Sequence, residues 1–187
     1  MDARQTEIVQ AAWAMFARYG YAKTTMSDIA RHAGVARQTV YNAFESKEDI
    51  LRAVVRLAGE QSLAAVLAAW VDEGSLERKI AAFQELGPLS WYEAMLSTPD
   101  WAEVMDGLHK EAVRELAGME TQWRRELVGM LREAQVPGGR DAASLEDIAE
   151  FLYATSKNAK YGAEDAAHMK RRLATIRAAT LALLGAD

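Results

Sequence analysis

The sequence predicts an all-α protein. Only 12 of its 187 residues are glycine and only 3 are proline, so few positions interrupt a helix. β-branched residues do not alternate with polar ones at the two-residue period of a strand, whereas apolar residues recur three and four positions apart along most of the chain. We therefore expect about nine helices and no sheet.

The first expected helix covers about residues 4–19. Ile8, Ala12 and Phe16 fall on one face of it at helical spacing. Gly20 follows, and glycine is favoured just past the end of a helix because it tolerates a positive φ.

Residues 24–47 have the pattern of a helix, a turn and a second helix. Thr25 and Asp28 have the spacing of a capping box, so the first of these helices is expected to start at Thr25. Gly34 suits the turn, and the next short helix is expected over about residues 36–44. This pattern is typical of a helix-turn-helix, whose second helix enters the major groove of DNA. An ordinary helix hairpin is the alternative.

Nearly all outward side chains of the second helix in this motif are capable of hydrogen bonding. Arg37 has the geometry to read guanine, Gln38 that to read adenine, and Thr39 suits a thymine methyl group or a phosphate. Three positions suit phosphates and are favoured as backbone contacts. They are a hydroxyl at a helix N-terminus (Thr25), a hydroxyl at the flank of the second helix (Tyr41) and a cation in the first turn of the next helix (Lys47). The candidate DNA-binding residues are Thr25, Ala36, Arg37, Gln38, Thr39, Tyr41, Asn42 and Lys47.

A long fourth helix is expected to follow this motif. Ser46 and Asp49 repeat the cap spacing, and the helix reaches about residue 71. It would join the N-terminal domain to the remainder of the chain without a flexible linker.

The middle of the chain carries two breaks in its helical pattern. A helix is expected over about residues 76–86, and Gly87 with Pro88 either ends it or kinks a helix that continues to about residue 96. The segment from Ser97 to Pro99 predicts a new helix start.

A sustained apolar seam then predicts one long helix over about residues 108–134. Its positions advance by fours and threes, and the segment from Pro137 to Gly139 ends it. The seam consists of Leu108, Ala112, Leu116, Met119, Trp123, Leu127, Met130 and Ala134.

Two helices are expected at the C-terminus, over about residues 144–161 and 164–184. Ser144 with Asp147 provides a third cap. Each helix has one apolar face, and such a hairpin forms a four-helix bundle when it pairs with a second copy. The expected dimer-interface residues are Ile148, Leu152, Thr155, Ala159, Ile176, Thr180 and Leu183.

The distribution of charge agrees with a DNA-binding N-terminal part. The net charge is −5, but residues 1–56 hold eight Lys/Arg and six Asp/Glu, a net of +2, and the remainder has a net of −7. The chain has no cysteine and its three histidines are far apart, so we expect no disulfide, metal or cofactor. It shows neither a signal peptide nor an apolar run long enough for a membrane span, so we expect a cytoplasmic protein.

The order of motifs along the N-terminal part resembles a known family. The pattern consists of Phe16, Gly20, Tyr21, Thr24, Thr25, Asp28, Ile29, Ala30, Ala33, Gly34, Val35, Thr39, Val40, Tyr41, Phe44, Ser46, Lys47 and Glu48. It resembles the tetracycline-repressor (TetR) family of bacterial transcriptional regulators over about residues 5–55. The resemblance implies that Thr25, Tyr41 and Lys47 contact the DNA backbone. Ala43 departs from the pattern, because many members carry an aromatic residue or histidine there.

The resemblance also implies how the chain is divided. Residues 1–50 would form the helix-turn-helix DNA-binding domain, and residues 51–187 the effector-binding and dimerisation domain. The second domain is rich in aromatic residues and methionine, which suit a small, largely apolar or aromatic effector. Such residues at helical spacing are more often core. The candidate effector contacts are Trp91, Tyr92, Met95, Trp101, Met105, His109, Trp123 and Tyr153.

The sequence bears on three classes of function. The leading hypothesis is a ligand-responsive transcriptional regulator, expected to be a repressor, that binds a palindromic operator as a homodimer and is released by an effector. An architectural DNA-binding protein without an effector is the alternative. An enzyme is not expected, because the chain shows no paired carboxylates, nucleophile with a base, phosphate loop or metal constellation.

Overall fold

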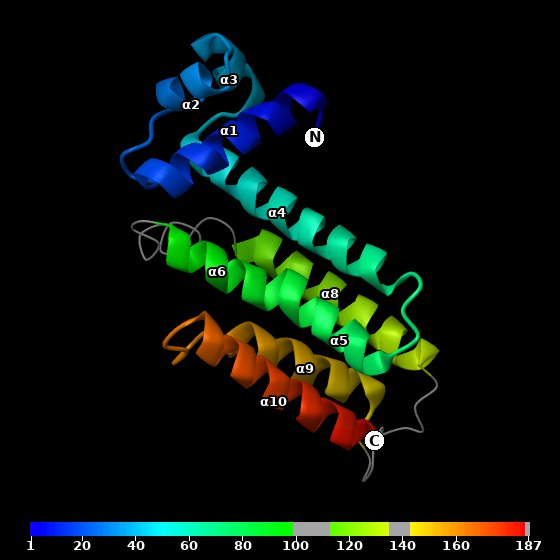
Figure 1. Cartoon of the computed structure of the whole chain (residues 1–187). Helices are drawn as coiled ribbons and strands as arrows, with labels where there is room; N and C mark the ends of the chain where they lie inside the picture. Colours follow the sequence, from blue (N-terminus) through cyan, green and yellow to red (C-terminus); the bar gives the residue numbers. More distant parts are fainter. Residues whose placement is uncertain (99–112, 135–142, 186–187) are drawn as a thin grey trace. The chain divides into compact units, whose positions relative to one another are not determined.

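A computed structural model describes residues 1–98, 113–134 and 143–185, and every regular element in these ranges is helical (Figure 1). The all-α prediction is therefore confirmed. None of the described helices is long and apolar enough to cross a membrane. The predictions for Pro99, residues 108–112 and residues 137–139 lie outside the described ranges.

The helices follow the order that the sequence predicts. They are α1 (Ala3–Tyr19), α2 (Met26–His32), α3 (Arg37–Ala43), α4 (Lys47–Trp70), α5 (Leu76–Gln84), the π-helix η1 (Glu85–Leu89), α6 (Ser90–Ser97), α8 (Val113–Glu133), α9 (Leu145–Asn158) and α10 (Ala166–Leu184). The chain divides into two compact units, Met1–Glu60 with Ala94–Met119, and Gln61–Glu93 with Glu120–Asp187. Helices α4, α6 and α8 contribute residues to both units.

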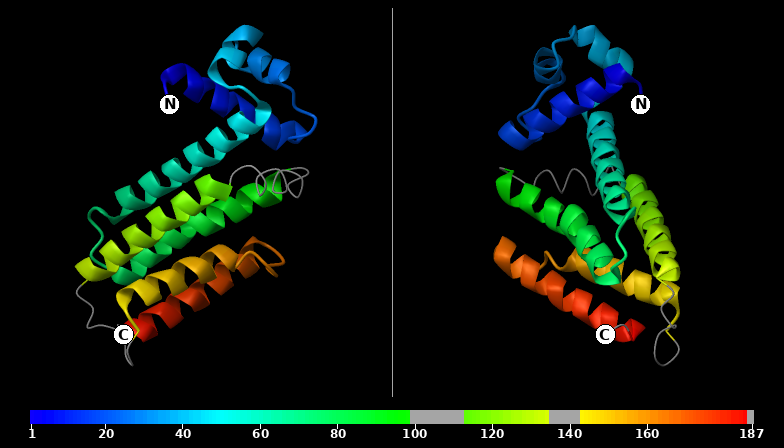
Figure 2. Two further views of the ribbon diagram at one scale, coloured as in Figure 1. Left: turned by 180° about the vertical axis from the view of Figure 1, so that it is seen from behind. Right: turned by 45° about the vertical axis from the view of Figure 1, so that its right-hand side comes forward.

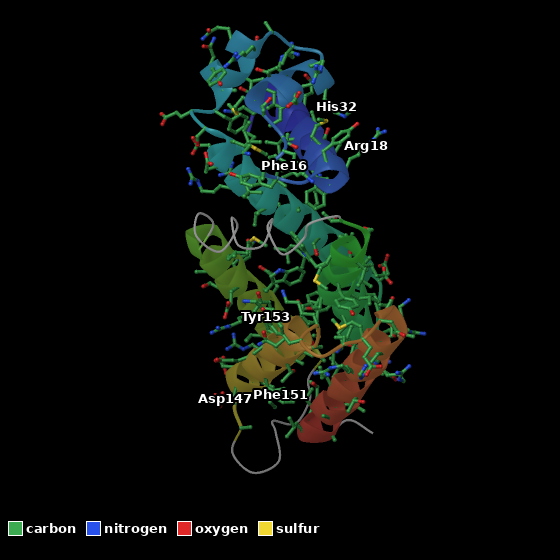
Figure 3. The ribbon with its side chains drawn as sticks, turned by 90° about the vertical axis from the view of Figure 1, so that its left-hand side faces the viewer. Phe16, Arg18, His32, Asp147, Phe151 and Tyr153 are labelled. Carbon is green, nitrogen blue, oxygen red and sulfur yellow. The ribbon has the colours of Figure 1, made fainter. Side chains whose placement is uncertain are left out.

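The first unit encloses its own apolar core. Ile8, Phe16, Ile29 and Val40 are fully buried, and Figure 3 shows Phe16 inside this unit. Ala30 is buried where α2 packs on α3, and a larger side chain there would separate the two helices. The core therefore fixes α3 relative to α1 and α2.

Local caps determine where several helices begin. Thr25 and Asp28 form the predicted capping box at the start of α2, and Ser144 and Asp147 form another at the start of α9. Gly34 has a φ of 68° in the turn between α2 and α3, a conformation that glycine adopts without steric cost.

A π-helix accommodates the proline in the middle of the chain. Helices α5, η1 and α6 follow one another without a break, so the predicted alternative of a helix that continues past Pro88 is the one observed. Proline removes one backbone hydrogen bond from a helix interior. In the same turn, the Leu86 carbonyl accepts a bond of 2.7 Å from the Ser62 hydroxyl of α4.

The second unit is a layered helical bundle whose C-terminal hairpin packs on α5. Helices α9 and α10 lie side by side (Figure 2), and α10 also contacts α5. A buried glutamine joins the three helices: the Gln84 side-chain amide donates to the Ser156 hydroxyl at 3.3 Å and to the Leu173 carbonyl at 3.0 Å. Its carbonyl accepts from Arg177 at 3.2 Å. These bonds satisfy both N–H donors and the carbonyl acceptor of the buried Gln84 side-chain amide.

Candidate nucleic-acid interface

The outer face of α3 is exposed and polar. Arg37, Gln38, Tyr41 and Asn42 are exposed, whereas Val40 on the opposite face is fully buried in the core of the first unit. Helical periodicity produces this division, because Val40 must face inward for α3 to pack. These four exposed residues are called the reading face, because they are predicted to contact DNA bases. The reading face is exposed to solvent on a helix whose inner face is fixed by packing.

Two pairs of side chains, each one helical turn apart, organise this face. An Arg37 Nη donates to the Tyr41 hydroxyl at 3.1 Å, with the guanidinium carbon 5.2 Å from the centre of the tyrosine ring. The Gln38 Nε2 donates to the Asn42 Oδ1 at 2.9 Å. Pairs at this spacing restrict the rotamers of long side chains before any partner arrives.

The two remaining predicted positions, Ala36 just before α3 and Thr39 on it, expose fewer hydrogen-bonding groups to a DNA partner. Ala36 is the exposed residue that precedes the helix, and its side chain makes no cap bond. Thr39 is half-buried, and its backbone N–H donates to the Ala36 carbonyl at 2.9 Å. Ala36 can therefore contribute only its backbone and methyl group, and Thr39 only part of its side chain.

Thr25 is committed to its own helix cap. Its hydroxyl donates to the Asp28 carboxylate at 2.6 Å and accepts from the Asp28 N–H at 3.2 Å. The hydroxyl and N–H of Thr25, followed by the charge of Arg31, lower the pKa of Asp28. An ionised carboxylate next to Thr25 opposes a phosphate at that hydroxyl, which the spacing alone did not indicate.

The pH dependence of the α2 cap can be measured. Because the pKa of Asp28 is lower in the folded chain than in the unfolded chain, its carboxylate contributes stability above about pH 4, and this contribution is lost as the pH falls through the folded pKa. We expect Asp28→Asn to lower the thermal midpoint at neutral pH and the gap to wild type to close in acid. A gap that stays constant from neutral pH to about pH 3 would refute this role.

Lys47 makes contacts that differ from the predicted phosphate contact. Its ammonium group donates to the carbonyls of Tyr21 at 2.8 Å and Thr24 at 3.0 Å, and lies 4.2 Å from the centre of the Tyr21 ring. These contacts tie the start of α4 to the loop between α1 and α2. The sequence could not indicate them, because they join residues more than twenty positions apart.

A hollow on the first unit was not predicted. It has a volume of about 630 Å³ and is lined by Met15, Tyr19, Lys23, Thr24, Asp28, Arg31 and His32. Arg18 and His32 are exposed, and Figure 3 shows them toward the outside of this unit. The lining residues come from α1, α2 and the loop between them, so no periodic signal unites them in the sequence.

The predicted effector contacts that the structure describes are largely core residues. Tyr92 is buried, with its hydroxyl donating to the Ala163 carbonyl at 3.1 Å, and Trp123 is buried 5.4 Å from the Phe83 ring centre. Tyr153 is also buried (Figure 3), and burial, reinforced by the charge of Glu120, raises its pKa to about 12. Trp91 and Met95 are half-buried. The predictions for Trp101, Met105 and His109 lie outside the described residues.

The predicted dimer interface needs a correction. Four of its residues are buried inside the chain itself, so they have no surface left for a second copy: Ile148, Leu152, Ala159 and Thr180. Apolar spacing identifies a face that must be covered, but it does not say whether the same chain or another covers it. Thr155 and Ile176 are half-buried, and Leu183 is exposed.

The described residues form no cluster of potential metal ligands. Within residues 1–98, 113–134 and 143–185, no group of three or more histidine, cysteine, aspartate or glutamate side chains is placed to hold a metal ion.

Comparison with known proteins identifies relatives of the N-terminal motif. The model of bacterial regulatory proteins of the tetR family matches residues 8–54. The uncharacterized HTH-type transcriptional regulator YfiR of Bacillus subtilis is 37% identical over 33% of this chain, and the match spans 30% of the length of YfiR. The HTH-type transcriptional repressor LfrR of Mycolicibacterium smegmatis is 27% identical over 74% of this chain, and the match spans 82% of the length of LfrR.

The fold extends this similarity to nearly the whole chain. The structure of SmeT in complex with triclosan superposes with a TM-score of 0.66 and 21% identity, covering 97% of this chain and 91% of that one. Because the sequence identity is only 21%, this similarity establishes the shared fold and nothing beyond it.

Proposed function

Because this chain belongs to the TetR family of bacterial regulatory proteins and is a DNA-binding transcriptional regulator, we propose that it is a ligand-responsive repressor. It binds a palindromic operator as a homodimer in the cytoplasm, where bacterial DNA lies, and a small effector releases it. The name of LfrR as a repressor supports the direction of regulation.

The observation that carries this proposal is the outer face of α3. Arg37, Gln38, Tyr41 and Asn42 present donors and acceptors to solvent without an acidic side chain among them. The buried Val40 and the packed α2 hold this face in place. A duplex offers complementary groups in its major groove, which is wide enough to admit a helix.

A palindromic operator requires two such faces. Two recognition helices must lie about 34–36 Å apart, one turn of DNA, to read successive half-sites. The surface positions that remain from the predicted interface are Thr155, Ile176 and Leu183 on α9 and α10. These positions support an interface through the surface of the C-terminal hairpin.

Continuous helices support the proposed response to an effector. Helices α4, α6 and α8 contribute residues to both units, so a ligand that shifts them in the second unit also acts on residues of the first. The ligand must bind the DNA-free state more tightly than the DNA-bound state. A coupling of about 1–3 kcal/mol would change operator affinity about 5–150-fold.

Arg37→Ala is expected to weaken specific DNA binding by about 1–3 kcal/mol and to relax selectivity at one base position. The guanidinium is exposed and oriented by Tyr41, so its removal costs base contacts without disturbing the core. Fluorescence anisotropy measures the change, with a duplex that the wild-type chain enriches from a library of random sequences. Arg4→Ala is the matched control, because Arg4 is an exposed cation on α1 that pairs with Glu7. Equal losses in the two variants would remove Arg37 from the reading face.

Release by a small molecule separates the regulator from an architectural DNA-binding protein. Triclosan is the first probe, since SmeT was solved with it, and a panel of aromatic and apolar compounds extends the search. We expect at least one compound to raise the thermal midpoint of the free chain. The same compound should lower the anisotropy of a labelled duplex, because the chain dissociates from it. DNA affinity that no stabilising compound changes would favour the architectural alternative.

A further inference from the structure

The pair formed by Gln38 and Asn42 limits what the reading face can recognise. Both residues are exposed on α3 one turn apart, and the Gln38 Nε2 donates to the Asn42 Oδ1 at 2.9 Å. A primary amide has two N–H donors and one carbonyl acceptor. The bond to Asn42 uses one donor of Gln38, so one N–H and the carbonyl are left for a base.

The four bases offer different patterns in the major groove. Adenine presents one acceptor, N7, and one donor, the N6 amino group, whereas guanine presents two acceptors, N7 and O6. An unpaired glutamine can turn its two N–H groups toward guanine or one N–H and its carbonyl toward adenine. The paired Gln38 retains only the second option, because its other hydrogen already points at Asn42.

We infer that Asn42 is a positioning residue that makes Gln38 specific for adenine over guanine. This inference rests on the DNA-binding function and names one base of the operator half-site. Asn42 acts through Gln38: it orients the amide plane and removes a donor. Its effect therefore falls on the choice of base at one position rather than on affinity for every sequence.

The neighbouring pair supplies an internal comparison. Arg37 and Tyr41 form a second pair one turn apart, and the structure shows no bond between the two pairs in the described α3. Tyr41→Phe removes the hydroxyl that orients Arg37 and keeps the ring. It should therefore alter preference at the position read by Arg37 and leave the position read by Gln38 as it is.

A purely structural role for Asn42 makes a different prediction. Amide pairs at this spacing also stabilise a helix slightly. If that were the only role, the loss of Asn42 would weaken binding to all duplexes by the same factor. Asn42→Asp distinguishes the two roles, because aspartate keeps an oxygen acceptor for the Gln38 N–H and adds a charge that DNA repels.

The test is selection from a library of random duplexes by the full chain and by each variant, with sequencing of the bound fraction. The position that Gln38→Ala makes degenerate should carry adenine in the wild-type selection. Asn42→Ala should lower the preference for adenine over guanine there by about tenfold, and Gln38→Ala combined with Asn42→Ala should give the same degenerate position as Gln38→Ala alone. Asn42→Asp should lower affinity for all duplexes and retain the adenine preference.

Two outcomes would overturn the inference while leaving the DNA-binding function intact. One is a wild-type preference for guanine, cytosine or thymine at the position that Gln38→Ala affects. The other is a uniform loss of affinity in Asn42→Ala with the adenine preference unchanged. A wild-type chain that enriches no sequence would instead contradict the proposed function, and the inference with it.

Discussion

Leu152→Glu is expected to unfold the second unit, even though Leu152 was predicted to lie at a dimer interface. The side chain is 0% exposed and packs in the core cluster with Leu127, Leu131 and Ile148. Truncation of a buried leucine alone costs about 2–5 kcal/mol, and a carboxylate without a partner adds its desolvation. The variant should lose at least about 4 kcal/mol, a large part of the stability of an ordinary domain.

Leu183→Glu is the matched control on the same hairpin. Leu183 is 39% exposed on α10, so glutamate at this position keeps its contact with water. We expect a folding midpoint close to that of the wild type and weaker association of protomers. Urea unfolding followed by circular dichroism measures stability, and sedimentation velocity measures association. A Leu152→Glu chain that folds with the wild-type midpoint but sediments as a monomer would restore Leu152 to the interface.

Lys47→Met is expected to lower the free energy of unfolding by about 2 kcal/mol. Each charge-assisted hydrogen bond contributes about 1.5–3 kcal/mol, and the half-buried position of Lys47 lets water replace part of this. Methionine retains the apolar stem against Tyr21 but leaves the carbonyls of Tyr21 and Thr24 without this donor. DNA affinity should fall as well, because the loop before α2 is no longer held to α4.

The phosphate-contact hypothesis for Lys47 predicts another result. A lysine that only contacts phosphate would leave thermal stability unchanged and would lower the slope of log affinity against log salt by about one. Arg56→Met removes the same charge from α4 at an exposed ion pair with Glu60, and should cost at most about 1 kcal/mol. Equal thermal midpoints for Lys47→Met and Arg56→Met would contradict the structural role of Lys47.

The sequence predicts those features that depend on neighbouring residues. Thr25 with Asp28 and Ser144 with Asp147 identify helix starts, because a cap is formed within four residues. The inward Val40 and the outward Arg37 also follow from the helical period alone. This is why the all-α fold and the helix-turn-helix could be predicted from the sequence alone.

Features that depend on residues far apart in the sequence cannot be predicted in this way. Gln84 is a polar residue in α5 whose partners on α9 and α10 lie 72 to 93 positions away, and nothing in its surroundings predicts its burial. Leu152 and Leu183 have the same apolar character in the sequence, yet one is in the core and the other on the surface. Only packing distinguishes a core face from an interface.

Competition between two duplexes tests the claim that the outer face of α3 reads a specific DNA sequence. One duplex carries the sequence that the chain enriches from a random library, and the other has the same bases in shuffled order. We predict that the chain binds the first at least about a thousandfold more tightly at physiological salt, and that Gln38→Ala with Arg37→Ala removes most of this ratio. Affinities for the two duplexes that agree within about threefold would contradict the claim, because binding would then rest on phosphate charge alone.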